Sequence, residues 1–340
     1  MKKVFSFSAI LIAMLVLGQV HAQKTFSILK TFHIASSGGW DYIAVGPGNN
    51  RLYVSHGTQV NILDATTGDS VGIIENTTGV HGIAFDKEHG KGFTSNGRIN
   101  NVTVFDLKTN QVITQIPTGQ NPDAIMFEPF TKTIITCNGR SKNLSIIDPV
   151  NNKTIDSIAV DGKPETAVSN GTGKIYVNIE DKSEIQEIDM KTMKVINTWS
   201  IKPAEEPSGL AIDTKTNRLF AGCGNKLMAV VDATNGKLIQ TLPIGDGCDG
   251  AAFDPGTKNA FTSNGEGILT IYHEASPDKY DLVANAPTKR GARTIAVDPL
   301  THLIYLPTAD FEQQTEQPAG GQRQRPRMIP GTFQILVVGQ

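Results

Sequence analysis

The fold is decided by the stretch His81-Gly-Ile-Ala-Phe-Asp86, Lys91-Gly-Phe-Thr-Ser-Asn-Gly97, Val102-Thr-Val-Phe-Asp106 and Val112-Ile-Thr-Gln-Ile-Pro117. Each segment is rich in β-branched, aromatic or small apolar residues, and turn-forming residues separate it from the next. Four short strands of this kind within about 40 residues are typical of one blade of a β-propeller. These residues therefore predict one four-stranded blade.

The same pattern occurs seven times. The innermost segments begin at Asp41, His81, Asp123, Glu165, Ser208, Asp249 and Arg293. The third segments end at Asp64, Asp106, Asp148, Asp189, Asp232 and His273. Both series advance by 40 to 44 residues, so no copy is missing or inserted. A blade cannot bury both faces of its sheet without neighbours, and we predict an all-β fold: a seven-bladed β-propeller over residues 23–340.

The two ends of the chain predict how the ring closes. Residues 26–33 read like a fourth strand but come before the first blade. The seventh copy ends after its third segment, at residues 332–337. We expect the N-terminal strand to complete the last blade, because this pairing removes two exposed sheet edges.

Residues 1–22 have the features of a signal peptide. Lys2 and Lys3 precede the apolar run 10–17, and Val20-His21-Ala22 supplies small residues at the expected cleavage point. The alternative is that these residues form a buried N-terminal helix. A membrane span is not expected, because the apolar run is too short for one. We expect a mature chain that begins at Gln23 and is periplasmic or secreted.

The charge balance narrows the classes of partner. The formal net charge is −2, and it becomes −4 without Lys2 and Lys3. This balance argues against a general nucleic-acid surface. We expect a monomer without a membrane span. The sequence contains no nucleophile elbow, HExxH, phosphate-binding loop or CxxC motif, so it favours a non-enzymatic role.

The aspartates that end the third segments indicate turn chemistry. Asp64-Ala-Thr-Thr-Gly68 and Asp232-Ala-Thr-Asn-Gly236 are examples. Aspartate accepts hydrogen bonds from turn amides, and Gly or Asn takes the left-handed conformation. Equivalent carboxylates in five turns are a structural repeat and do not form a catalytic set.

A candidate site lies on one face of the ring. Strand direction alternates within a blade, so the start of the first strand and the end of the second share a face, called here the top face. The second strands end there at His56, Asn96, Asn138, Cys223, Asn264 and Thr308. From both series we predict ligand-binding residues Asp41, His56, His81, Asn96, Asp123, Asn138, Glu165, Asp249, Asn264 and Arg293.

These side chains have two interpretations. Carboxylates and imidazoles that converge at the channel mouth could hold a divalent cation, and we expect no other cofactor. The alternative is that they bond loop amides of the next blade. His56 and His81 are the strongest candidates, because most copies carry Asn or an acid at these positions.

Two further features depart from the repeat. Cys223 and Cys248 fall on neighbouring blades at the same face, which suggests a disulfide, whereas Cys137 lies within an apolar strand. Residues 309–331 form a long Gln-, Pro-, Gly- and Arg-rich loop in the last blade. Such a loop is either functional or disordered. Its arginines (Arg323, Arg325 and Arg327) would reach the acidic mouth in the first case.

Several segments resemble a known family. Arg51-Leu-Tyr-Val-Ser55, Lys174-Ile-Tyr-Val-Asn178 and Val102-Thr-Val-Phe-Asp106 are similar to the repeats of YVTN-type, YncE-like β-propellers, over about residues 26–338. The resemblance implies a secreted or periplasmic binding or scaffold protein. Other copies depart from the motif, as in Phe93-Thr-Ser-Asn-Gly97 and Phe261-Thr-Ser-Asn-Gly265.

Two functions follow as hypotheses. The favoured one is a binding or scaffold protein that engages an unidentified protein or small molecule through its top face. The alternative is a metal-dependent hydrolase that resembles gluconolactonase-type propellers, with a lactonase site at the channel mouth.

Overall fold

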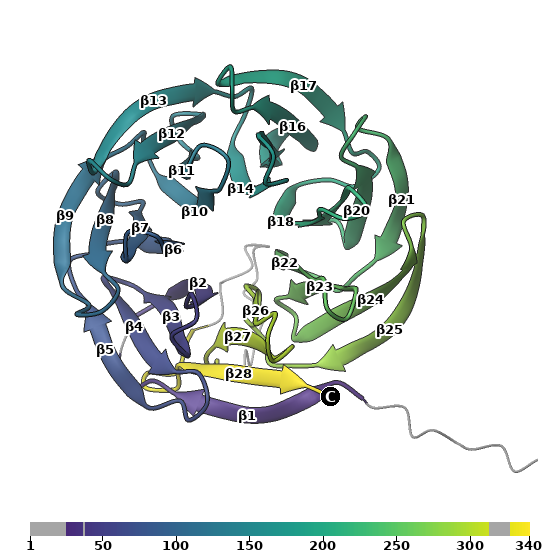
Figure 1. Ribbon diagram of the computed structural model, residues 1–340. Coiled ribbons are helices and arrows are strands. Elements are labelled where there is room, and N and C mark those ends of the chain that lie inside the picture. The colour runs from purple at the N-terminus through teal and green to yellow at the C-terminus, as the bar shows by residue number, and fades with distance from the viewer. Residues whose placement is uncertain (1–24, 37, 313–326) are drawn as a thin grey trace, which may run out of the picture.

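The computed structural model describes residues 25–36, 38–312 and 327–340. Within these residues the chain forms 28 strands and one short 3-10 helix. The strands make seven four-stranded antiparallel sheets that are arranged as a ring (Figure 1). The predicted seven-bladed β-propeller is confirmed. The predicted signal peptide, residues 1–22, lies outside the described residues.

The first three blades follow the predicted order, with the first strand innermost. Blade one contains β2 (Trp40–Val45), β3 (Arg51–His56), β4 (Gln59–Asp64) and β5 (Ser70–Ile74). Blade two contains β6 (Val80–Asp86), β7 (Lys91–Asn96), β8 (Asn101–Asp106) and β9 (Val112–Pro117). Blade three contains β10 (Pro122–Glu128), β11 (Thr133–Asn138), β12 (Asn143–Asp148) and β13 (Lys153–Ala159).

The next three blades repeat this arrangement. Blade four contains β14 (Pro164–Ser169), β15 (Lys174–Ile179), β16 (Glu184–Asp189) and β17 (Lys194–Ser200), with the 3-10 helix η1 (Glu180–Lys182) after β15. Blade five contains β18 (Pro207–Asp213), β19 (Arg218–Cys223), β20 (Leu227–Asp232) and β21 (Leu238–Pro243). Blade six contains β22 (Cys248–Asp254), β23 (Asn259–Asn264), β24 (Ile268–Ser276) and β25 (Lys279–Pro287).

Blade seven joins both ends of the chain. It contains β26 (Ala296–Val297), β27 (Ile304–Thr308), β28 (Gln334–Gly339) and β1 (Ser27–His33). β1 pairs antiparallel with β28, from Ser27 opposite Gly339 to His33 opposite Gln334. Figure 1 shows the two strands side by side at the outer edge of the ring. The predicted closure by the N-terminal strand is therefore confirmed.

The recurring aspartates act as predicted in the turns. The Oδ1 atom of Asp64 accepts hydrogen bonds from the backbone N–H groups of Thr66 and Thr67, at 2.8 and 2.9 Å. Asp106, Asp148 and Asp189 each accept an equivalent pair of hydrogen bonds from the backbone N–H groups two and three residues further along the chain. These carboxylates end the third strands at the face opposite the top face and are part of the scaffold.

The hydrophobic core lies between adjacent blades. Leu52 and Val54 of blade one, for example, pack with Tyr305 and Ile335 of blade seven, and all four are almost fully buried. This packing of each sheet on the next gives the ring a rigid wall, and that wall sets the positions of the first strands around the axis.

Cys137, Cys223 and Cys248 are buried free thiols in the structure. Cys223 ends β19 and Cys248 begins β22, two strands in contact across blades five and six. The pairing of Cys223 with Cys248 remains a prediction that mass measurement after non-reducing alkylation would decide.

None of the helices among the described residues is long and apolar enough to cross a membrane.

Candidate functional site

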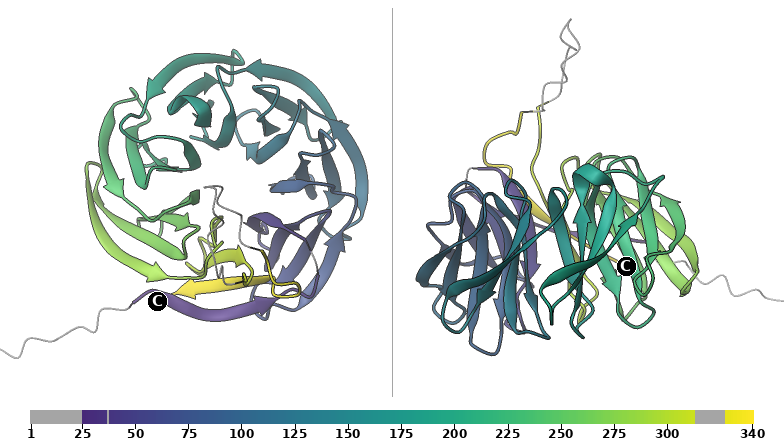
Figure 2. Two further views of the ribbon diagram at one scale, coloured as in Figure 1. Left: turned by 180° about the vertical axis from the view of Figure 1, so that it is seen from behind. Right: turned by 90° about the horizontal axis from the view of Figure 1, so that it is seen from above.

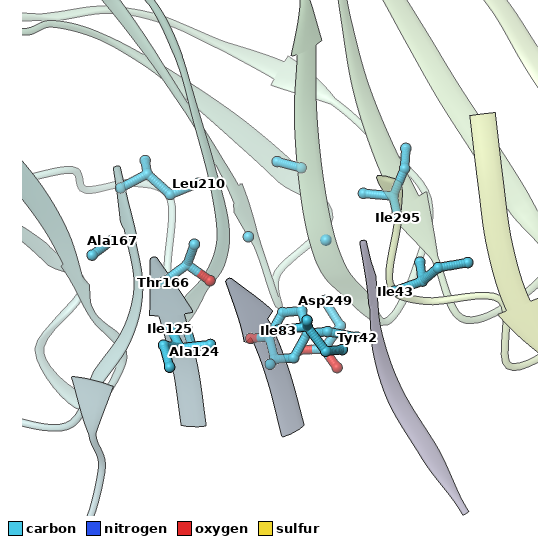
Figure 3. Close-up of a pocket in the computed structure, with 14 residues that line it drawn as sticks. Tyr42, Ile43, Ile83, Ala124, Ile125, Thr166, Ala167, Leu210, Asp249 and Ile295 are labelled. Carbon is cyan, nitrogen blue, oxygen red and sulfur yellow. The ribbon is translucent and has the colours of Figure 1, made fainter. Parts of the chain in front are cut away.

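A narrow cavity of about 180 Å³ runs along the axis of the ring (Figure 3). Most of its lining comes from the first strands of the blades, and it is largely apolar. The lining includes Ile43, Ile83, Ile125, Ala167, Leu210, Ala251 and Ile295. Tyr42, Thr166 and Asp249 add polar groups to this wall. The cavity is therefore an apolar channel with a few polar positions.

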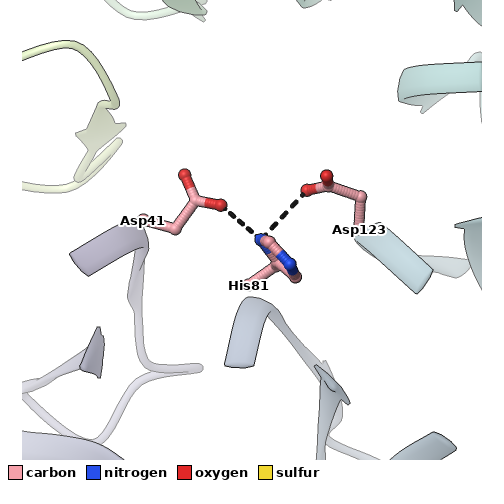
Figure 4. A group of neighbouring side chains, drawn as sticks. All are labelled: Asp41, His81 and Asp123. Atoms are coloured by element: carbon pink, nitrogen blue, oxygen red, sulfur yellow. Dashed lines mark hydrogen bonds and ion pairs between the residues drawn. The ribbon is translucent and has the colours of Figure 1, made fainter. Parts of the chain in front are cut away.

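A histidine between two aspartates lies at the top face of this channel (Figure 4). The Nδ1 atom of His81 lies 2.6 Å from Oδ2 of Asp41 and 3.5 Å from Oδ1 of Asp123. The three residues occupy equivalent positions near the starts of β2, β6 and β10. The exposed fraction of the side chain is 16% for Asp41, 27% for His81 and 13% for Asp123. The site is thus shielded but open to small solutes.

Ion pairs extend this group around the mouth. The guanidinium of Arg293 lies 3.4 Å from Oδ1 of Asp41 and also contacts the carboxylate of Asp249. On the other side, Nζ of Lys163 lies 3.1 Å from Oε2 of Glu165 and contacts Glu180. We call the six predicted residues at the strand starts the charged ring: Asp41, His81, Asp123, Glu165, Asp249 and Arg293. Blade five contributes the neutral Ser208 at this position.

The protonation of the ring reflects its burial and its like charges. Burial raises the pKa of Asp123 to about 7, and the nearby charges of Glu165 and Asp41 add to this effect against the opposing charge of His81. Burial and the charge of Glu180 also raise the pKa of Glu165, although Lys163 opposes the shift. Burial would lower the pKa of His81, but the hydrogen bond to Asp41 and the surrounding carboxylates outweigh it and raise the pKa. Asp123 therefore titrates near neutral pH, where an isolated aspartate is fully ionised.

Tyr42 belongs to the site although the repeat pattern does not predict it. Its aromatic ring lines the channel and packs against the core of blades three and four, opposite its own blade. Burial raises the pKa of its phenol well above the ordinary value, and Asp123, Asp41 and Glu165 contribute. The sequence does mark Tyr42 as unusual, because the other six copies carry the smaller residues Gly, Ala or Thr at this position. Lys163 and Glu180 lie outside the strand starts and carried no such signal.

The outer predicted residues are separated from this mouth. Asn96, Asn138 and Asn264 end second strands, are fully buried, and donate hydrogen bonds within their own blades. His56 is 1% exposed, and its Nδ1 lies 2.7 Å from Oγ of Ser36. Burial lowers the pKa of His56 and so favours its neutral form. A ligand at the channel mouth would contact the charged ring and not these four side chains.

The base of the long loop in blade seven has regular structure. Phe311 and Met328 form an antiparallel bridge, and N–H of Glu312 donates to the carbonyl of Arg327 at 2.8 Å. The ring of Phe311 lies 6.1 Å from that of Trp40, which precedes Asp41. Figure 2 shows this segment standing above one face of the disc. Arg323 and Arg325, predicted to reach the mouth, lie outside the described residues.

We expect the two candidate histidines to titrate on opposite sides of the ordinary value of 6.5. NMR titration of the imidazole signals should place His81 above it and His56 below it. The stability contributed by His81 is then present below pH 6.5 and is lost as the pH rises through its raised pKa. Asp41→Asn should lower the pKa of His81, whereas Asp86→Asn, a matched change beside His89, should not. A pKa for His81 below that of His56 would contradict this account.

Comparison with known proteins supports the fold and does not extend to a family. No family model matches the chain, and no curated protein matches it. Among solved structures, the chain is similar to hydrazine synthase of Kuenenia stuttgartiensis, with a TM-score of 0.70 and 19% identity. The match covers 81% of this chain and 94% of that chain. At this identity the similarity shows the β-propeller fold alone, and membership of the YncE-like family remains a prediction.

Proposed function

We propose that this chain is a periplasmic or secreted binding protein that holds a small cationic ligand at the mouth of its channel. The observation that carries the proposal is the charged ring, in which four carboxylates face one arginine and one histidine. An acidic opening with low-dielectric walls concentrates cations. The neighbouring base of the blade-seven loop offers a surface that a protein partner could use in a scaffold role.

The channel behind the ring supports a small ligand. Its volume of about 180 Å³ accommodates a short apolar group and excludes a folded segment of a partner. The walls are rigid, because the first strands are held on both sides by neighbouring blades. Binding sites of this kind combine an apolar lining with a few polar groups that fix the orientation of the ligand.

A ligand screen with paired variants tests the proposal. Alkylamines, diamines, guanidinium compounds and divalent ions would be screened by thermal shift, and hits measured by calorimetry. We expect Asp249→Asn to weaken a hit about tenfold, which corresponds to about 1.4 kcal/mol. Glu88→Gln removes the same charge from the exposed opposite face, where Glu88 pairs with Lys132, and should leave affinity unchanged. Equal affinities in the two variants would refute a ligand site at the mouth.

A metal-dependent lactonase-like hydrolase remains the second candidate. The specific observation in its favour is the group Asp41, His81 and Asp123, whose ligand atoms all lie within 4.8 Å of one another. Such an enzyme needs a bound ion and a carboxylate that acts as base beside its water. Metal analysis followed by a lactone-hydrolysis screen tests it. Protein that contains no metal and is not stabilised by added Ca²⁺ or Zn²⁺ would exclude this candidate.

A further inference from the structure

The three residues at the centre of the charged ring have the chemistry of a transition-metal site. We infer that Asp41, His81 and Asp123 together bind one divalent first-row transition-metal ion, of the kind represented by Zn²⁺. This inference rests on the proposed function and names the cation. An imidazole nitrogen beside two carboxylates favours Zn²⁺, Ni²⁺ or Co²⁺ over Ca²⁺ and Mg²⁺, which prefer oxygen ligands alone.

The three donor atoms all lie within 4.8 Å of one another, close enough to reach a single ion after a small adjustment. Zinc binds nitrogen and oxygen at about 2.1 Å, so donors around a tetrahedral ion lie about 3.4 Å apart. Nδ1 of His81 is already 3.5 Å from Oδ1 of Asp123. The 2.6 Å separation from Oδ2 of Asp41 would have to widen by less than 1 Å. Rotation of the Asp41 side chain is sufficient for a change of this size.

The backbone of the two aspartates is held in place by hydroxyl groups. N–H of Asp41 donates to Oγ of Ser55 at 3.0 Å, and Oγ1 of Thr294 donates to the carbonyl of Asp41 at 2.5 Å. Oγ of Ser95 donates to the carbonyl of Asp123. These bonds fix the backbone from which the two carboxylates project, so only side-chain rotation is needed to bring the donor atoms around an ion.

A second, independent observation is the unused acceptor capacity of two buried carboxylates at this group. The side chain of Glu165 is nine-tenths buried, and among the described residues its Oε2 atom is held only by the ion pair with Lys163 at 3.1 Å. The charge of Glu165 acts on both His81 and Asp123. Among the described residues, the one ion-pair partner of the Asp123 carboxylate is His81, at a distance too long for a good hydrogen bond. The carboxylates of Glu165 and Asp123 can therefore accept more bonds than the described residues supply.

The opposite face supplies a natural control. Nδ1 of His89 lies 2.6 Å from Oδ2 of Asp86, the same distance as in the pair of His81 and Asp41. The His89 pair has a single carboxylate, and within the described part of the chain the only group of three clustered ligands is the one at the mouth. A general affinity of histidine–aspartate pairs for metal would therefore appear in both pairs.

Calorimetric titration of the metal-free full chain with ZnCl₂ tests the inference. We expect one ion per chain, with His81→Gln and Asp123→Asn each weakening binding at least about 100-fold, since changes to outer-shell partners alone cost up to that much. His89→Gln should bind as the parent does. The melting temperature of each variant without metal shows whether it is folded. If His81→Gln is not folded, Asp123→Asn still tests the inference.

Anomalous diffraction from crystals soaked in ZnCl₂ locates the ion directly. A peak between Asp41, His81 and Asp123 is expected. A peak elsewhere, or a Zn²⁺ affinity unchanged by both variants, would overturn the inference. If Zn²⁺ fails to bind while Asp249→Asn still weakens an organic cation, the metal assignment falls and the proposed function stands. If both fail, the proposed function falls as well.

Discussion

Phe32→Ala should destabilise the propeller by about 3–5 kcal/mol, the usual cost of removing a fully packed phenylalanine. Phe32 is 5% exposed and lies on β1, the strand that closes blade seven. Its ring packs against blade one, where a Cβ atom on Gly68 would lie 2.2 Å from Cδ1 of Phe32. The side chain therefore joins the first and last blades, and its loss weakens the closure of the ring.

Leu29→Ala is the matched control for this change. Leu29 is on the same strand but 49% exposed, so its truncation should cost less than about 1 kcal/mol. Urea denaturation of both variants, followed by circular dichroism and fluorescence, measures the difference. Equal losses of stability would show that β1 contributes through its backbone pairing alone and that the closure does not depend on Phe32.

Gly209→Ala should cost about 3 kcal/mol, at the upper end of the usual range for overpacking. Gly209 follows Ser208 on β18, where the first strands crowd around the axis. A Cβ atom there would lie 2.3 Å from the backbone N of Ala251 and 2.5 Å from the carbonyl carbon of Gly250. These atoms belong to the backbone of blade six, so no side-chain rotation relieves the clash. Blades five and six would have to separate.

Gly139→Ala provides the comparison, because it is also buried but has room. The nearest atoms to a Cβ at Gly139 are 3.5 Å away and belong to side chains. At a position whose backbone conformation alanine can adopt, replacing glycine restricts the unfolded chain and stabilises the fold by about 0.4–1 kcal/mol. This variant should therefore be as stable as the parent or slightly more stable in thermal melts. If the Gly209→Ala variant melts at the same temperature as the Gly139→Ala variant, the close approach of blades five and six is contradicted.

Much of the fold was predictable because its determinants are local. The turn aspartate at residue 64 and the strand alternation at residues 102–105 act within a few residues, and seven copies average out the errors of any single one. Six first strands begin within one residue of the predicted position, whereas β26 begins at Ala296, three residues after Arg293. The N-terminal strand was assignable because the last copy lacked one.

The candidate site was predictable only in part. Positions in the repeat placed Asp41, His81 and Asp123 on one face, but the same reasoning placed Asn96 and His56 with them. Side-chain depth separates the two sets, and depth depends on how the blades pack. The partners Lys163 and Glu180 reach the mouth from the residue before β14 and from the 3-10 helix η1, and the repeat does not specify either conformation.

The sequence by itself determined the architecture: the number of blades, the order of strands, the closure by residues 26–33 and the face on which polar residues gather. Only the tertiary structure decided which of those residues meet. His81 lies 40 residues from Asp41 and 42 from Asp123, and their contact depends on the radius of the ring. Close packing of small residues such as Gly209 sets that radius. A repeat encodes contacts within a blade, whereas distances across the channel depend on all seven blades together.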